Sequence, residues 1–292
     1  MFNDYKKSGI IHKIISNKVK NILNTGISSL EIVEFIENEI NKLTKFDFKN
    51  PLKSGIAFPV GIGINEIAAH FTPDIYNNPI IKNDDIVKID YGIHINGCIT
   101  DGAFSWCPSG KYNELINISK EATNVGIKNA GINMNLGEIG YYIQEYIESK
   151  EIVINNKSFQ IKSIWDLCGH RMKPYRIHSK KAVPNIAINY NERMEEDEVY
   201  AIETFPTFGN GSVYHDKICN HYMINNYDDK MDENTKKIYN IRSTLAFCPR
   251  WFNFNIPDTQ YISKFPVLIS DGLVAQTEKS VYIKSDSIII LN

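Results

Sequence analysis

Two aspartates, Asp90 and Asp101, share one strand-like stretch, which reads VKIDYGIHINGCITDGAF over residues 87–104. On one continuous strand their odd spacing would point the side chains to opposite faces, because side chains alternate along a strand. The Asn96-Gly97 pair changes this expectation, since Asn-Gly between alternating apolar residues is the strongest short signal for a β-hairpin. The stretch therefore predicts two antiparallel strands joined by a tight turn.

The turn sets the register of this hairpin. If Ile95 pairs with Cys98, Asp90 and Asp101 become diagonal neighbours on one face, about 7–8 Å apart at the backbone. His94 shares their face nearer the turn, and we expect a structural role for it. The opposite face suits a core and carries Val87, Ile89, Tyr91, Ile93, Ile95, Thr100, Phe104 and Trp106.

Neighbouring carboxylates repel each other, so the aspartate face needs a shared proton, a basic side chain or a cation. From the hairpin alone a solvated polar face is the favoured interpretation, and a metal site needs further ligands from other parts of the chain. Glu203 is a candidate because it ends the apolar strand in YAIETF. Glu278, in VAQTEKSVYI, alternates along a strand and taken alone would be a surface residue.

Three histidines near turn signals are further candidates. His170 and His178 flank Lys173-Pro174 in GHRMKPYRIH, and a bend there would return both rings to one cleft. A straight strand would instead hold them about 26 Å apart. His70 precedes a Thr-Pro-Asp turn in NEIAAHFTPD. Because a single histidine is more often structural than catalytic, each assignment depends on what the fold places beside it.

Seven sequence blocks occur in an order that resembles the type 2 methionine aminopeptidases, members of the dinuclear-metal pita-bread family. The blocks are AFP with NEIAAHFTP, VKIDYGIHINGCITDGAF, GHRMKPYRIH, RMEEDEVYAIETF, CNHYM, TLAFCPRWF and VAQTEKS. Residues 224–264 are similar to the helical insertion that separates type 2 from type 1. The resemblance implies an α+β pita-bread fold with two halves related by a pseudo-twofold axis, an antiparallel sheet covered by helices, and one catalytic domain over residues 1–292.

The activity implied by the resemblance is removal of the N-terminal initiator methionine from nascent proteins and peptides, through a hydroxide that bridges two divalent metal ions (Mn, Co, Fe or Zn). The implied metal ligands are Asp90, Asp101, His170, Glu203 and Glu278. This oxygen-rich donor set suits those metals. The implied catalytic residues are His70, His178 and Glu203, with Glu203 transferring a proton and the histidines hydrogen-bonding the scissile amide. The residues expected to bind the substrate are His70, His178, Phe58, Ile177, His221 and Phe265.

Four departures from the family pattern leave turnover, metal preference and specificity for the second residue open. Cys168 stands where Asn is usual before Gly-His, and Arg171–Pro174 replaces a smaller, glycine-containing stretch. Pro206 stands where Gly is usual, and Lys279 where His is usual. The long charged N-terminal extension of eukaryotic relatives, associated with ribosome contact, is also absent from the sequence.

Two alternatives remain open from the sequence. An Xaa-Pro dipeptidase or proline aminopeptidase shares the fold, but the single-domain length, the helical insertion and the NEIAAHFTP block argue against it. A non-catalytic homologue that binds RNA, ribosomes or proteins typically loses metal ligands, whereas all five are present here. The retained ligands, and the absence of a strong basic tract, favour an enzyme.

The elements that would position these residues alternate between helical and strand-like blocks. A capping box at Ser28-Ser29-Leu30-Glu31 lies within a helical segment that spans the first 45 residues. The run Glu195–Glu198 is expected to form a solvated turn. The other expected blocks are strands from Phe58 to about Trp106, two helices over 113–150 with a break near Gly131–Gly137, strands over 151–205, a helical excursion over 226–250 and C-terminal strands.

Two segments share a pattern of acid, apolar strand and acid. They are Asp85–Asp90 (DIVKID) and Glu198–Glu203 (EVYAIE), which start 113 residues apart. Six positions do not establish a repeat, but each segment predicts a strand that ends in a carboxylate. Two related halves that meet at an acidic centre, within a single α+β domain, would explain the pattern.

Bulk properties limit the classes of partner. The 292 residues carry a net charge of −2, which gives no reason to expect a specific nucleic-acid partner. No apolar run approaches the roughly 20 residues of a membrane span, and the N-terminus lacks the apolar core of a signal peptide. The five cysteines are scattered, which favours free thiols in the cytoplasm. We expect a cytoplasmic monomer that acts on nascent polypeptide N-termini (Met-Xaa with small Xaa), with transient ribosome contact.

Overall fold

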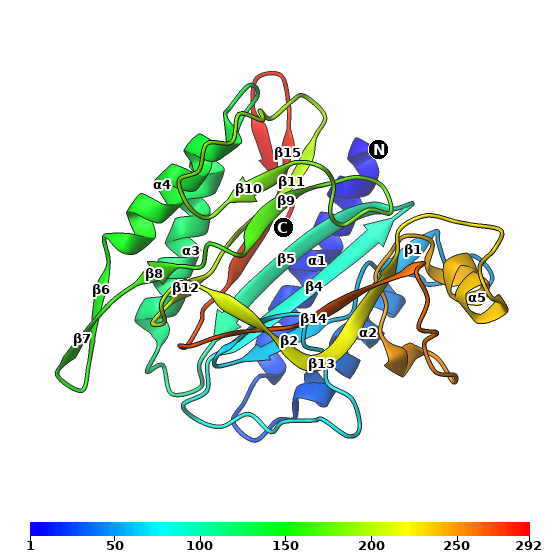
Figure 1. Ribbon diagram of the computed structural model, residues 1–292, viewed down its shortest axis with the longest axis horizontal. Helices are drawn as coiled ribbons and strands as arrows, with labels where there is room; N and C mark the ends of the chain where they lie inside the picture. Colours follow the sequence, from blue (N-terminus) through cyan, green and yellow to red (C-terminus); the bar gives the residue numbers. More distant parts are fainter.

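The computed structural model describes residues 1–292 and contains two central antiparallel sheets that lie side by side (Figure 1). In the first sheet, β4 (Val87–Ile95) pairs with β1 (Ser54–Ile56), β2 (Gly61–Ile64) and β5 (Cys98–Trp106). The strand order in the second sheet is β10 (Ala182–Pro184), β9 (Cys168–Met172), β11 (Val199–Thr204), β15 (Thr277–Ile283) and β16 (Ile288–Ile290). The sheets meet where β5 lies beside β15.

Four helices cover one face of these sheets (Figure 1). The first sheet packs against α1 (Phe2–Ile22) and α2 (Ser29–Thr44), and the second against α3 (Asn113–Lys128) and α4 (Leu136–Glu148). The predicted capping box starts α2, because the Ser28 hydroxyl accepts the N–H of Glu31 and the Glu31 carboxylate accepts the N–H of Ser28. The apolar faces of helices and strands form two large core clusters, one for each half. None of the helices is both long enough and apolar enough to cross a membrane.

A third antiparallel sheet crosses the face of the central strands that these four helices leave open (Figure 1). It contains β13 (Val213–Ile224), β14 (Ile262–Ser270) and β3 (Ile67–Ala69). Two small sheets pair β12 (Pro206–Thr207) with β8 (Lys162–Ser163), and β6 (Glu151–Ile154) with β7 (Lys157–Gln160). Between β13 and β14 the chain forms α5 (Glu233–Arg242) and a 3-10 turn, η1 (Pro249–Trp251), as the helical pattern predicts.

The hairpin of β4 and β5 has the predicted register. Asp90 lies opposite Ala103, and Asp101 lies opposite Gly92. The turn residues Asn96-Gly97 have φ values of 50° and 79°, the positive values that a type I′ turn requires. The apolar face of β4 joins the core cluster beneath α1 and α2, so both aspartates point to the opposite, open face of the sheet.

The two halves of the fold repeat one local arrangement, as the acid–strand–acid pattern predicts. Asp85 and Glu198 stand just before β4 and β11, and each accepts the backbone N–H of the residue three positions earlier. Lys82 N–H donates to Asp85 Oδ2 at 2.8 Å, and Glu195 N–H donates to Glu198 Oε2 at 3.0 Å. The same hydrogen bond therefore occurs just before β4, which carries Asp90, and just before β11, which carries Glu203.

The strand registers extend this pseudo-twofold relationship to β5 and β15. When Asp90 is superposed on Glu203, Ala103 and Ser105 of β5 correspond to Glu278 and Ser280 of β15. The register continues past the start of β15, because the Ala275 N–H donates to the Pro206 carbonyl, and Asp101 then corresponds to Gln276. The two serines play equivalent parts. Ser105 Oγ bonds both the N–H and the C=O of Gln276, and Ser280 Oγ bonds both the N–H and the C=O of Asp101, each at 2.8 Å. Two serine hydroxyls thus join the sheets in place of a backbone ladder.

The prediction of a solvated turn at residues 195–198 is wrong for Glu198. Its carboxylate is only 3% exposed and is held by Lys181 Nζ at 2.9 Å, Arg171 Nη1 at 2.9 Å and the hydroxyl of Tyr200. Because a buried carboxylate is stable only when it is paired, these partners explain why an acid can sit inside the second half.

Candidate metal centre

Five polar side chains from five strands converge on the open face of the central sheets. They are Asp90 (β4), Asp101 (β5), His170 (β9), Glu203 (β11) and Glu278 (β15). Register explains the convergence in the second half: Glu203 lies directly opposite Glu278, and His170 lies opposite Ala201, which precedes Glu203 by two residues. Residues two apart share a face of a strand, so all of these side chains point the same way.

The imidazole of His170 lies between carboxylates of both halves. Its Nε2 is 3.6 Å from Asp101 Oδ2 and 3.6 Å from Glu203 Oε1. Asp101, His170 and Glu278 each offer a donor atom, and these three atoms all lie within 4.8 Å of one another. These distances are longer than a hydrogen bond, and they are the distances expected between ligand atoms that surround one cation.

The carboxylates have strongly shifted pKa values. Burial raises the pKa of Asp90 to about 6. The pKa values of Asp101, Glu203 and Glu278 are raised well above the usual range, first by burial and then by repulsion from the neighbouring carboxylates. Burial, followed by the nearby His178, lowers the pKa of His170 well below its usual range. The protein alone therefore disfavours the charged cluster.

The donor set fits a divalent cation. No lysine or arginine forms an ion pair with the four carboxylates. Asp90 Oδ1, Asp101 Oδ1 and Glu278 Oε1 are buried without a hydrogen-bond partner. Because buried polar atoms are normally paired, several unpaired oxygens that face one space indicate a ligand-binding site. Hard oxygen donors with one imidazole suit divalent metals.

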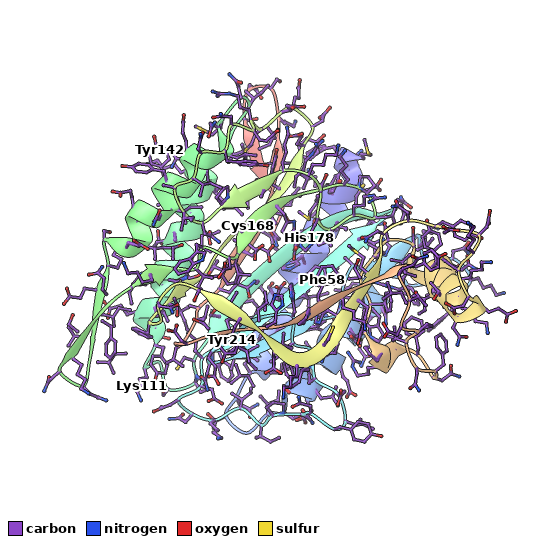
Figure 2. All side chains as sticks on the ribbon, in the orientation of Figure 1. Phe58, Lys111, Tyr142, Cys168, His178 and Tyr214 are labelled. Atoms are coloured by element: carbon purple, nitrogen blue, oxygen red, sulfur yellow. The ribbon has the colours of Figure 1, made fainter.

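The five side chains of the cluster line a cavity of about 360 Å³. Every residue predicted as a metal ligand, a catalytic residue or a substrate-binding residue lines it: Phe58, His70, Asp90, Asp101, His170, Ile177, His178, Glu203, His221, Phe265 and Glu278. In Figure 2, Phe58, Cys168 and His178 are labelled over the central strands, whereas Tyr142 and Lys111 lie at the periphery. The fold thus brings together residues that are spread over more than 200 positions of the chain.

The predicted bend between His170 and His178 is present. Lys173 and Arg176 face each other across a tight turn, in which Tyr175 has a φ of 62°. The turn returns the two imidazoles to the same cavity, with ring centroids 4.4 Å apart. His178 lines the cavity and keeps some accessible surface. Desolvation of its ring, followed by the nearby His70, lowers its pKa to about 4, so the ring is neutral.

His70 has a backbone conformation that side chains rarely adopt. Its φ is 64°, in the left-handed region, and such strain in a non-glycine residue is characteristic of functional sites. Its Nδ1 lies 3.3 Å from the carbonyl of Pro266, which can only accept, so Nδ1 carries the proton. Burial lowers the pKa of His70, which leaves a neutral ring with Nε2 as an acceptor.

Aromatic and apolar residues form another part of the cavity lining, here called the aromatic wall. Phe58 lies directly on Gly92, where a Cβ would come within 2.2 Å of the ring. Phe265 lies with its ring centroid 5.8 Å from that of His70 and 6.5 Å from that of His178. His221 Nε2 is held 3.3 Å from the carbonyl of Pro59. The wall is therefore fixed close to the polar cluster.

Sequence reasoning missed some residues that line the cavity. Gln276 lines the cavity because it lies two residues before Glu278, and alternate residues of an extended chain point to the same side. The same alternation in the sequence is the signal that identifies Gln276. Asp166, an exposed acid, also lines the cavity. Of the departures from the family pattern, Cys168 lines the cavity, whereas Pro206 and Lys279 are not among the lining residues.

Similar folds occur among solved structures. A methionine aminopeptidase from Thermotoga maritima superposes with a TM-score of 0.70 at 17% identity, covering 99% of this chain and 95% of that chain. A thermophilic Arx1 superposes with a TM-score of 0.77 at 15% identity, covering 99% of this chain and 90% of that chain. These relationships confirm the α+β pita-bread fold.

Sequence relatives are closer. Methionine aminopeptidase 2 of Dictyostelium discoideum is 42% identical over 258 residues, which are 87% of this chain and 58% of the relative. Methionine aminopeptidase 2A of Arabidopsis thaliana is 36% identical over 282 residues, which are 94% of this chain and 63% of the relative. These matches confirm the resemblance to type 2 methionine aminopeptidases. The chain spans less than two thirds of the length of either relative.

The fold and the sequence relatives place the chain among the pita-bread peptidases. Residues 3–264 match the family model described as Metallopeptidase family M24. The chain belongs to this family.

Proposed function

We propose that the protein is a metalloaminopeptidase that removes the N-terminal methionine from nascent polypeptides whose second residue is small. The observation that carries this proposal is the convergence of the five candidate ligands, two neutral histidines and an aromatic wall on one cavity. The sequence relatives named methionine aminopeptidase support it. The carboxylate cluster in the cavity suits a free α-amine, and the apolar part of the lining suits a thioether side chain.

Two divalent cations would be held by Asp90, Asp101, His170, Glu203 and Glu278. We propose manganese, iron, cobalt or zinc, because carboxylates with one imidazole suit these metals. Such cations, when bound, lower the pKa of a water molecule and polarise the scissile carbonyl. The unpaired buried oxygens of Asp90, Asp101 and Glu278 support this assignment.

Three side chains would handle protons and orient the peptide. Glu203 lines the cavity, and its carboxylate would take a proton from water and pass it to the leaving amine. His70 presents Nε2 as an acceptor, which suits the N–H of the scissile amide. His178 has no fixed partner and can donate to the oxygen on which charge develops.

The chain is proposed to form one catalytic domain, with residues 224–264 as a helical insertion within it. This segment has its own small core, which includes Met231, Ile238 and Phe247. It also supports the cavity wall, since Arg242 Nη2 donates to the carbonyls of Ile56 and Ala57, next to Phe58. We propose that this domain works in the cytoplasm as a monomer, with transient contact to the ribosome; the five free cysteines and a cavity built by one chain support this view.

Metal removal and readdition test the proposed reaction. We expect protein treated with a chelator to release no methionine from Met-Ala-Ser, and readdition of Mn²⁺, Co²⁺, Fe²⁺ or Zn²⁺ to restore release. A parallel assay with an Ala-Pro substrate tests the Xaa-Pro alternative, because an Xaa-Pro peptidase would cleave this substrate. A folded protein that releases no methionine with any of these metals would contradict the proposal and favour a binding function.

A further inference from the structure

Gln276 occupies a special position in the pseudo-twofold arrangement. It is the counterpart in the second half of Asp101 in the first half, because the register of β11 and β15 continues to Ala275 and because Ser105 bonds Gln276 as Ser280 bonds Asp101. Its side chain is 2% exposed and lines the cavity. The second half therefore presents an amide where the first half presents a carboxylate.

The amide of Gln276 contacts one carboxylate from each half. Its Nε2 lies 3.1 Å from Asp90 Oδ2 and 3.5 Å from Glu203 Oε2. A primary amide nitrogen carries two N–H groups, which is enough to donate to both oxygens. One oxygen of each carboxylate remains outside these contacts: Asp90 Oδ1 has no partner, and Glu203 Oε1 faces His170 Nε2 at 3.6 Å.

The backbone that carries this amide is fixed from the first half. Ser105 Oγ accepts the N–H of Gln276 and donates to its carbonyl, both at 2.8 Å. Two residues earlier, the carbonyl of Val274 accepts a hydrogen bond from the buried Lys88 Nζ at 2.9 Å. Since Ser105 and Lys88 belong to β5 and β4, the amide is held in register with Asp90.

We infer that Gln276 is a positioning residue that fixes the orientation of Asp90 and Glu203, so that each keeps one oxygen free for a divalent cation. The inference rests on the cation site of the proposed function, but not on the peptidase reaction. Donors that orient metal-binding carboxylates belong to the supporting shell of a metal site, and losing one typically reduces metal affinity 10–100-fold. A fifth carboxylate at this position would instead add repulsion.

The test is Mn²⁺ binding to the full chain, measured by isothermal titration calorimetry after chelation. Gln276→Met keeps the length of the side chain and removes its donors, and we expect the Kd for Mn²⁺ to rise about 10–100-fold. Gln260→Met makes the same chemical change at an exposed position and should leave the Kd unchanged. Circular dichroism and thermal unfolding without metal establish that each variant folds.

Ser105→Ala provides a second measurement, because it removes the hydroxyl that fixes the backbone of Gln276. We expect a smaller rise in the Kd for Mn²⁺, in the same direction. If Gln276→Met does not fold, this variant decides the question.

An unchanged Kd for Mn²⁺ in folded Gln276→Met would overturn the inference, as would a changed KM for peptide at saturating Mn²⁺ with no change in Mn²⁺ affinity. If the wild-type protein binds Mn²⁺ but releases no methionine, the proposed function fails, and the Kd of Gln276→Met still decides the inference.

Discussion

Asp101 and Ser280 join the two halves of the molecule beside the metal centre. The N–H of Asp101 donates to Ser280 Oγ at 2.8 Å, and the same hydroxyl donates to the Asp101 carbonyl at 2.8 Å. Asn292 reinforces the junction, since its Nδ2 donates to the Asp101 carbonyl at 2.7 Å and its Oδ1 accepts the N–H of Ser280 at 2.8 Å. The backbone of a candidate ligand from the first half is thus fixed by residues of the second half.

We expect Ser280→Ala to lower the free energy of unfolding by about 1–3 kcal/mol, because the N–H of Asp101 loses its buried partner. Urea unfolding of the chelated protein measures this loss. Ser287→Ala, at an exposed position, is the control and should change stability by less than about 0.5 kcal/mol. Equal stability of the Ser280 variant and the wild type would show that this hydroxyl does not hold the halves together.

Asp101→Asn should separate metal binding from folding. Asparagine has the same shape but no charge, so it removes a candidate ligand and also the repulsion with Asp90 that helps to raise the pKa of Asp101. We expect the chelated variant to be at least as stable as the wild type, with loss of metal occupancy and of methionine release. Metal content by elemental analysis checks the occupancy, with exposed Asp286→Asn as the control; full occupancy in Asp101→Asn would show that Asp101 is not a ligand.

Much of the placement of the candidate site follows from local sequence signals. The Asn96-Gly97 turn and strand alternation predict that Asp90 and Asp101 share a face, because both rules depend only on neighbouring residues. The break at Lys173-Pro174 likewise predicts that the chain reverses after β9. Glu278 is different. Strand alternation alone predicts a surface residue at this position, and only the family resemblance predicts that Glu278 belongs to the site.

Other features depend on partners from distant parts of the chain, which local patterns do not contain. Glu198 lies in an acidic run, yet its burial is determined by Lys181 and Arg171. The hydrogen bonds by which Ser105 and Ser280 join the two halves could not be predicted from the sequence. No turn connects β5 directly to β15, so no local signal sets the register between these two strands. Such contacts appear only once the halves are assembled.

Protonation of His12 should contribute to acid unfolding. Burial lowers the pKa of His12 to about 3, while its Nε2 lies 3.0 Å from the Tyr91 carbonyl and its ring stacks on Tyr91. Between pH 6.5 and 3 the unfolded chain therefore binds a proton that the folded chain does not, so stability rises with pH and is lost as the pH falls. The expected contribution is about 1.4 kcal/mol per pH unit within this window.

Comparison of the wild type with His12→Gln isolates this contribution from that of the other buried histidines. We expect urea unfolding of the variant between pH 6.5 and 4 to show a slope smaller by about 1 kcal/mol per pH unit. Parallel curves for the two proteins would show that His12 does not change protonation on unfolding.

The strained backbone of His70 can be tested separately from its imidazole. His70→Gly and His70→Ala both remove the ring, and we expect both to lower kcat at least about 100-fold, because a hydrogen-bonding partner of the scissile amide is lost. Their stabilities should differ, since only glycine adopts a φ of 64° without strain. We therefore expect His70→Gly to be more stable than His70→Ala by about 1 kcal/mol in urea unfolding. Equal stabilities would show that the backbone at this position stores no strain, and wild-type turnover in either variant would remove His70 from the proposed reaction.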